Sequence, residues 1–199
     1  MKNINIFLDL EHSYKYILYY VTKLIKANKK GEIYEQTTCS FVVLGGISVF
    51  LASNLLSSVG YLIWVGFIAW GLFFKNGGDN NALKMTITAG VYGAVLAGLF
   101  FVLSGAINIG GSLNGPIWIA ITVFLLIFGT QIPIFSCAPT AVCGYAATAG
   151  YVIHAADGAM IPMISSAAMH NPVITVSISI IIGTIFGMLS GKAAAAIGN

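Results

Sequence analysis

The sequence predicts an all-α integral membrane protein with six transmembrane helices, and three observations support this fold class. Of the 199 residues, 58% are hydrophobic and only 8% are charged, whereas soluble domains carry about 25% charged residues. Three long segments contain no Asp, Glu, Lys or Arg, namely residues 37–74, 85–156 and 158–191. Their apolar residues do not alternate strictly, and a chain in lipid must satisfy its own backbone hydrogen bonds, which favours helices over a barrel.

Each charge-free segment is long enough to hold one or more membrane helices. A single span needs about 20 apolar residues, so the middle segment can hold three. Gly, Ser, Asn and Pro residues punctuate the segments and mark the expected ends of the spans. The spans are expected at about residues 38–56, 59–74, 84–105, 117–132, 134–152 and 173–193.

Residues 1–36 differ from the rest of the chain because they carry charge and follow an amphipathic pattern. Apolar side chains recur at the spacing of one helix face, at Leu10, Tyr14, Ile17, Leu18, Val21, Leu24 and Ile25. Lysines flank or oppose that face. The pattern predicts a helix that either lies in the membrane interface or docks on the protein's own cytoplasmic surface. The chain is thus divided into a segment of residues 1–36 and a membrane domain of residues 37–199.

Lysine placement predicts the orientation of the chain in the membrane. The chain has nine lysines and no arginine, and six of the lysines precede the first span. Lys75 and Lys84 flank the loop after the second span, and Lys192 ends the last. Cytoplasmic loops are enriched in Lys and Arg, and an even number of spans puts all nine lysines on one side. Both termini are therefore expected in the cytoplasm, with the loops at 106–116 and 153–172 on the outer face.

Two sequence runs carry a resemblance to a known family. One is the run Trp-Val-Gly-Phe-Ile-Ala-Trp-Gly-Leu-Phe-Phe at 64–74, followed by a Gly/Asn turn. The other is Pro-Thr-Ala-Val-Cys-Gly-Tyr-Ala-Ala-Thr at 139–148, followed by a final span that ends at Gly191. Over about residues 41–192 the chain resembles the small bacterial inner-membrane proteins of domain of unknown function 1097. The resemblance implies a multi-pass protein of the bacterial cytoplasmic membrane and no established substrate, with residues 1–36 as an addition.

The two halves of the membrane domain also resemble each other. Residues 66–71 can be aligned with residues 140–145, and each run is followed by a span that ends in Leu-Ser-Gly, at 103–105 and at 189–191. Three spans per half, with the second half starting on the opposite side, is the inverted-repeat arrangement of many transporters and channels. The sequence therefore indicates a 3+3 inverted repeat.

The fifth span carries the densest set of polar and soft side chains in the apolar part of the chain. Pro133 opens it, and Pro139 is expected to interrupt it and to free carbonyl groups near the midplane. Broken helices of this kind line solute sites, whereas small residues also serve close helix packing. Asn54 in the first span suits either a solute pathway or an interhelical hydrogen bond. The candidate pathway residues are Asn54, Gln131, Ser136, Pro139, Thr140, Cys143 and Thr148.

The loop at 153–172 is unusually apolar for a free loop and is a candidate re-entrant segment. It contains His154 and Asp157, which lie one helical turn apart and form a titratable pair outside the expected cytoplasmic face. These two residues are candidates for a proton-sensitive outer mouth of a pathway, and the alternative is a surface hydrogen bond. The three cysteines have no C-x-x-C spacing, and no metal site is expected.

Composition and motifs favour transport over catalysis. The chain has no Arg-rich patch, so no nucleic-acid partner is expected. It lacks a His-Glu-x-x-His motif and paired intramembrane carboxylates, so neither an enzyme nor a cofactor is expected. Charge-free spans favour a channel or transporter for a small neutral or weakly charged solute, with the lipid bilayer and that solute as partners. The alternative is a membrane scaffold or subunit without transport, and a homo-oligomer is left open.

Overall fold

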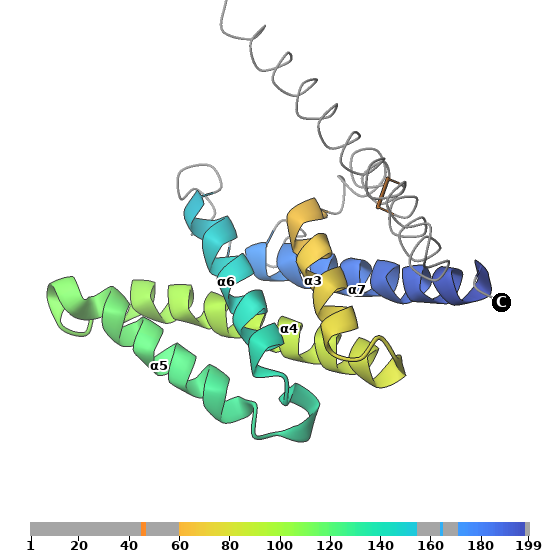
Figure 1. Ribbon diagram of the computed structural model, residues 1–199. Coiled ribbons are helices and arrows are strands. Elements are labelled where there is room, and N and C mark those ends of the chain that lie inside the picture. The colour runs from red at the N-terminus through yellow and green to blue at the C-terminus, as the bar shows by residue number, and fades with distance from the viewer. Residues whose placement is uncertain (1–44, 47–59, 155–163, 165–170, 198–199) are drawn as a thin grey trace, which may run out of the picture.

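The computed structural model describes residues 45–46, 60–154, 164 and 171–197. These residues contain the α-helices α3 (Ile63–Lys75), α4 (Asn80–Ala106), α5 (Asn114–Gly129), α6 (Ala138–His154) and α7 (Pro172–Ile197) (Figure 1). Two short 3-10 helices, η2 (Gly111–Leu113) and η3 (Pro133–Phe135), lie in the connections. The part of the chain described here contains no strand, so the all-helical prediction is confirmed for it.

Three of these helical stretches are long and apolar enough to cross a membrane, namely residues 80–106, 111–129 and 172–196. This supports a membrane-embedded protein. The predicted second and fifth spans form the shorter helices α3 and α6, of 13 and 17 residues. The predicted first span and the segment at 1–36 lie outside the described residues.

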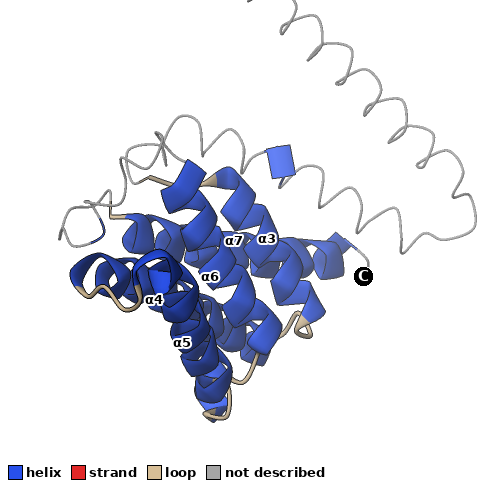
Figure 2. Cartoon of the chain, turned by 90° about the vertical axis from the view of Figure 1, so that its left-hand side faces the viewer, coloured by secondary structure: helices blue, strands red, loops and turns tan. Residues whose placement is uncertain are grey.

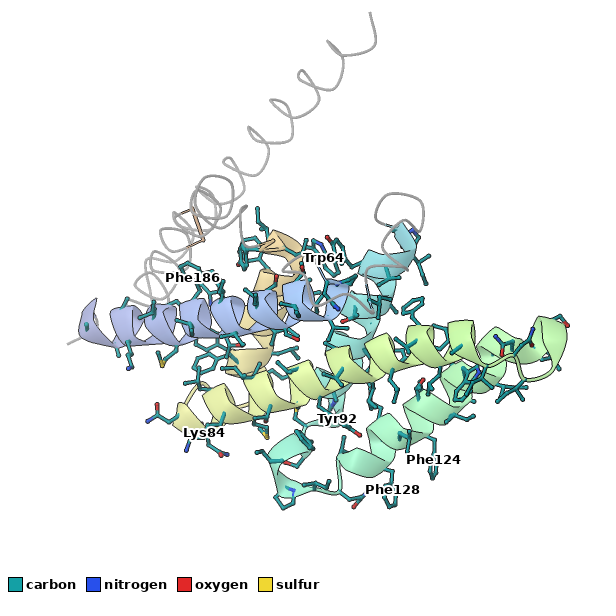
Figure 3. All side chains as sticks on the ribbon, turned by 180° about the vertical axis from the view of Figure 1, so that it is seen from behind. Trp64, Lys84, Tyr92, Phe124, Phe128 and Phe186 are labelled. Atoms are coloured by element: carbon teal, nitrogen blue, oxygen red, sulfur yellow. The ribbon has the colours of Figure 1, made fainter. Side chains whose placement is uncertain are left out.

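α4 and α7 run antiparallel to each other (Figure 1) and lie in one helical bundle with α3, α5 and α6 (Figure 2). α3 crosses α7, and α6 crosses α4, so each short helix packs mainly on one long helix. α5 turns back along α4. Phe124 and Phe128 on α5 point away from the bundle and stack on each other, with ring centroids 6.0 Å apart (Figure 3). An exposed apolar face of this kind suits contact with lipid.

Glycine residues allow each short helix to approach its long partner at backbone distance. On α6, a Cβ atom at Gly144 would overlap the carbonyl oxygen of Gly90 on α4. A Cβ atom at Gly93 would overlap the carbonyl oxygen of Ala141 in the same crossing. Small residues let membrane helices approach this closely and gain van der Waals contact. The sequence of glycines on α4 and α6 therefore fixes where the two helices cross.

The second crossing, between α3 and α7, is built in a similar way. A Cβ atom at Gly183 on α7 would lie 2.7 Å from the carbonyl carbon of Gly66 on α3. Two side-chain hydrogen bonds flank the crossing. The backbone N–H of Leu62 donates to Ser179 Oγ at 2.8 Å, and Trp70 Nε1 donates to Ser190 Oγ at 3.0 Å.

The expectation that Pro139 interrupts the fifth span is wrong. The chain breaks before this residue, after η3, and α6 begins at Ala138, so Pro139 lies in the first turn with its ring exposed. Proline is tolerated there because the N–H groups of a first turn have no partner within the helix. Pro139 therefore does not disrupt the hydrogen-bond ladder of α6.

The described lysines gather at one end of the bundle. Lys75 is the last residue of α3, Lys84 lies in the second turn of α4, and Lys192 lies in the last turns of α7. The end of α3, the start of α4 and the end of α7 lie on the same side of the bundle (Figure 1). We refer to this side as the lysine end.

Candidate functional site

A small cavity lies at the centre of the bundle, where α3, α4, α6 and α7 meet. Its volume is about 10 Å³, which is room for about one water molecule. Apolar side chains of α3 and α7 form much of its wall, and Gly90 and Gly144 bring backbone to its surface. Its polar and soft groups come from Thr86 on α4 and from Thr140 and Cys143 on α6. Among the described residues, none that lines it carries a charge.

A ring of hydrogen bonds closes the cavity on the side nearer the lysine end. The Asn76 amide nitrogen donates to Thr86 Oγ1 at 2.9 Å and to Thr140 Oγ1 at 3.1 Å. The Cys137 thiol donates to Asn76 Oδ1 at 3.3 Å, and Cys137 Sγ lies 3.0 Å from Thr140 Oγ1. We call Asn76, Thr86, Cys137 and Thr140 the polar cluster. It joins the end of α3 to the starts of α4 and α6.

The turn after α3 directs Asn76 inwards. Asn76 is the C-cap of the helix, and its N–H donates to the carbonyl of Leu72. Gly77 and Gly78 follow with φ of 120° and 69°, a backbone region that glycine adopts without steric cost. Asp79 then caps α4 by accepting a hydrogen bond from the N–H of Ala82 at 2.7 Å. The chain reverses within three residues. The Asn76 side chain therefore points towards Thr86 and Thr140, which line the cavity.

Apolar side chains close the cavity on the opposite side. Val65, Ala69, Ala147 and Ile180 line the cavity and belong to a buried cluster with Ala94 and Val176. Leu62, Val173 and Tyr151 pack against that cluster. They come from the start of α3, the start of α7 and the end of α6, which face away from the lysine end. The cavity therefore has polar groups on one side and, on the other, apolar side chains that we call the apolar seal.

The structure brings two of the predicted pathway residues to one place. Thr140 and Cys143 line the same cavity, as expected for positions three apart on a helix. Thr148 is buried, but its hydroxyl donates to the carbonyl of Gly144 in its own helix at 3.0 Å. Gln131 and Ser136 are exposed in the connection before α6.

The remaining predicted residues stand apart from the cavity or cannot be placed. His154 is exposed at the end of α6. Asn54, Asp157 and most of the loop at 153–172 lie outside the described residues. Sequence reasoning missed Asn76 and Thr86. No sequence signal singles them out: Asn76 precedes two glycines as in a surface turn, and Thr86 lies within the charge-free run at 85–156.

Metal-ligating side chains do not cluster in the described part of the chain. Among the residues given in the structure, no group of three or more His, Cys, Asp or Glu could hold a metal ion. Cys137 and Cys143 are free thiols. The chemistry of the site therefore consists of hydroxyl, thiol and carboxamide hydrogen bonding.

A protein-family model matches most of the chain. The model of a family described as "Protein of unknown function (DUF1097)" matches residues 39–195. No curated protein and no solved structure matches the chain. The match agrees with the family indicated by the two sequence runs at 64–74 and 139–148.

Proposed function

The chain belongs to the DUF1097 family, whose description assigns no activity, and from the site we propose that it is a channel or transporter for a small neutral or weakly charged solute. It acts as a multi-pass protein of the bacterial cytoplasmic membrane, without catalysis. Its partners are the bilayer and the solute.

The central cavity is the observation that carries this proposal. It lies where four apolar helices meet, and its polar groups are two hydroxyls and a thiol. Such groups can replace part of the hydration shell of a small polar solute. A charged solute would find no opposite charge there, and burial of an unpaired charge is costly. A cavity of about 10 Å³ corresponds to a closed state, so transport requires the polar cluster and the apolar seal to open.

Helix pairing supports a 3+3 inverted repeat, with residues 38–56 as the first of six spans. In that arrangement α3 corresponds to α6 and α4 corresponds to α7, so the α3–α7 pair is the counterpart of the α6–α4 pair. Both pairs form close contacts, and both cross at glycine. α4 and α7 run antiparallel (Figure 1), as an inverted repeat requires. Two similar pairs around one cavity suit a rocking motion of one pair against the other.

The lysine end supports an orientation with both termini in the cytoplasm. Lys75, Lys84 and Lys192 share that end, and cytoplasmic ends of spans are enriched in lysine. The polar cluster then faces the cytoplasm, and the apolar seal faces the outer side.

The test is solute flux into proteoliposomes of the purified protein, measured for a panel of small neutral solutes. Thr140→Val keeps the side-chain volume and removes a hydroxyl from the cavity, so it should change flux several-fold. Thr140→Trp should block flux by filling the cavity. Thr130→Val is the matched control, because the Thr130 hydroxyl donates to a carbonyl of its own helix, at Ile127, away from the cavity. Unchanged flux in both Thr140 variants of a folded protein would remove the cavity from the pathway and favour a scaffold role.

A further inference from the structure

The polar cluster provides hydrogen-bond partners for both polar atoms of the Asn76 carboxamide, its nitrogen and its oxygen. The two hydrogens of the amide nitrogen have two hydroxyl acceptors, Thr86 Oγ1 and Thr140 Oγ1, at 2.9 and 3.1 Å. The amide oxygen has one donor, the Cys137 thiol, at 3.3 Å. The Thr140 hydroxyl can in turn donate to Cys137 Sγ, 3.0 Å away. The result is a closed ring from amide N–H to hydroxyl to thiol to amide oxygen, in which each bond strengthens the next.

The groups that hold the carboxamide do not come from the segment that carries it. Thr86 belongs to α4, Cys137 precedes α6 and Thr140 belongs to its first turn, whereas Asn76 lies on the turn after α3. Thr86 and Thr140 also line the central cavity. If Asn76 were displaced with its turn, two hydroxyls and a thiol would remain in the arrangement that binds a carboxamide, and both hydroxyls line the cavity. Gly77 and Gly78 follow Asn76 directly and allow such a movement, because glycine has the widest backbone freedom.

We propose that Thr86, Cys137 and Thr140 form a binding site for a small primary amide or urea, and that Asn76 fills this site in the closed state as a built-in mimic of the solute. This inference deepens the proposed function, on which it rests for the role of the solute. It names the solute class and makes displacement of Asn76 the step that opens the cytoplasmic side of the cavity.

The hydrogen-bonding pattern distinguishes amides from other small solutes. A carboxylate can accept from the hydroxyls and the thiol, but it brings a charge into a cavity whose described lining has no countercharge. An ammonium ion offers no acceptor to the thiol. A ketone accepts from the thiol but donates nothing. A primary amide or urea supplies two N–H donors on one nitrogen and an adjacent acceptor, as Asn76 does.

The test is chemical rescue of the full-length protein in detergent, with acetamide as the probe. Asn76→Ala removes the carboxamide and leaves its three partners without it. Acetamide at about 100 mM, a concentration suited to a ligand of four heavy atoms, should raise the unfolding temperature of this variant by about 2–4 °C. It should raise that of the unsubstituted protein far less, because Asn76 already fills the site. Adding Thr140→Val to Asn76→Ala should abolish the rescue.

Two controls separate a built site from general effects of the additive. Asn114→Ala is the matched variant, because the Asn114 carboxamide also joins two backbone groups, the N–H of Ile109 and the carbonyl of Ser104. That site lies at the start of α5, beside the exposed connection from α4 and away from the polar cluster, so acetamide should not rescue it. Acetate and acetone at the same concentration should not rescue Asn76→Ala.

Equal stabilisation of Asn76→Ala, Asn114→Ala and the unsubstituted protein by acetamide would overturn the proposal. Asn76 would then only join the end of α3 to α4 and α6. Equal rescue by acetone would overturn it as well. If Asn76→Ala does not yield folded protein, Asn76→Ser shortens the side chain at the same cap, and the same outcomes apply. The rescue assay measures the unfolding temperature and needs no transport activity. Amide binding by a protein that shows no flux would therefore refute the proposed transport function but leave the amide-binding site supported.

Discussion

The close approach of α6 to α4 at Gly144 gives a direct test of the fold, because a side chain does not fit at this position. A Cβ atom there would lie 2.9 Å from the carbonyl carbon of Gly90 and 3.1 Å from its Cα, and would overlap the carbonyl oxygen. Optimal carbon–carbon separations are about 3.5–4.0 Å. The obstructing atoms belong to the backbone, so no change of rotamer can relieve the overlap. Gly144→Ala must therefore push the two helices apart.

The size of the effect follows from two opposing terms. Overpacking costs about 1–3 kcal/mol of unfolding free energy, and obstruction by backbone puts Gly144→Ala at the upper end, at about 3 kcal/mol. Alanine recovers about 0.5–1 kcal/mol, because it is the better helix former. Gly150 on the same helix is the matched control, because a Cβ atom there meets no atom within 4 Å. Gly150→Ala should gain only the helix-propensity term, so the two variants should differ by about 3 kcal/mol.

The measurement is thermal unfolding in one detergent, followed by the fluorescence of Trp64, Trp70 and Trp118. For a chain of this size, 1 kcal/mol shifts the unfolding temperature by about 2–4 °C. Gly144→Ala should therefore unfold about 6–12 °C below Gly150→Ala. All scans should use one heating rate, because unfolding of membrane proteins in detergent is often irreversible. Coincident transitions of the two variants would refute the backbone contact at Gly144.

Three further predictions test other parts of the structure. Gly183→Ala should lower the unfolding temperature by several degrees more than Gly191→Ala, since a Cβ atom at Gly183 meets the backbone of Gly66, whereas one at Gly191 meets two ring carbons of Phe74 at 3.4 and 3.6 Å; equal losses would contradict the α3–α7 crossing. Pro139→Ala should change the unfolding free energy by less than about 0.5 kcal/mol, as expected for an exposed first-turn site. A large loss would indicate that Pro139 interrupts the fifth span after all. In a protein without native cysteines, Asn114→Cys should react with an impermeant thiol reagent outside intact cells and Gly78→Cys should not; the reverse labelling would invert the orientation.

The helices could be predicted from the sequence because lipid imposes a simple rule on them. Every backbone polar group in a span must be bonded within its own helix, so apolar run length and Gly/Pro punctuation suffice. The expected spans at 59–74, 84–105, 117–132, 134–152 and 173–193 each overlap one helix. Pro139 was misplaced because the break fell a few residues earlier, at η3, and proline is equally suited to a first turn.

The polar cluster could not be predicted, because apolar spans give little indication of which face points inwards. α4 is apolar on all sides, so its periodicity does not single out Thr86. Thr148 and Thr140 lie on the same helix, yet Thr148 bonds a carbonyl of α6 whereas Thr140 meets Asn76. Asn76 beside two glycines is typical of a surface turn. Its inward direction depends on the positive φ of Gly77 and Gly78, which becomes evident only in three dimensions.

The shortness of α3 has a consequence for the membrane around the protein. Thirteen residues at 1.5 Å each give about 20 Å, whereas the hydrocarbon core of a bilayer is about 30 Å thick. Hydrophobic mismatch of this kind is met by local thinning of the bilayer and by snorkelling of flanking residues, at a modest cost per ångström. Lys75 at the end of α3 is suited to snorkelling, since its exposed ammonium group can reach the headgroups. Because α3 forms one wall of the cavity, the apolar layer beside the cavity is thinner than the surrounding bilayer. Lipids with short acyl chains should then stabilise the protein best, and acyl-chain length becomes a means of controlling its stability.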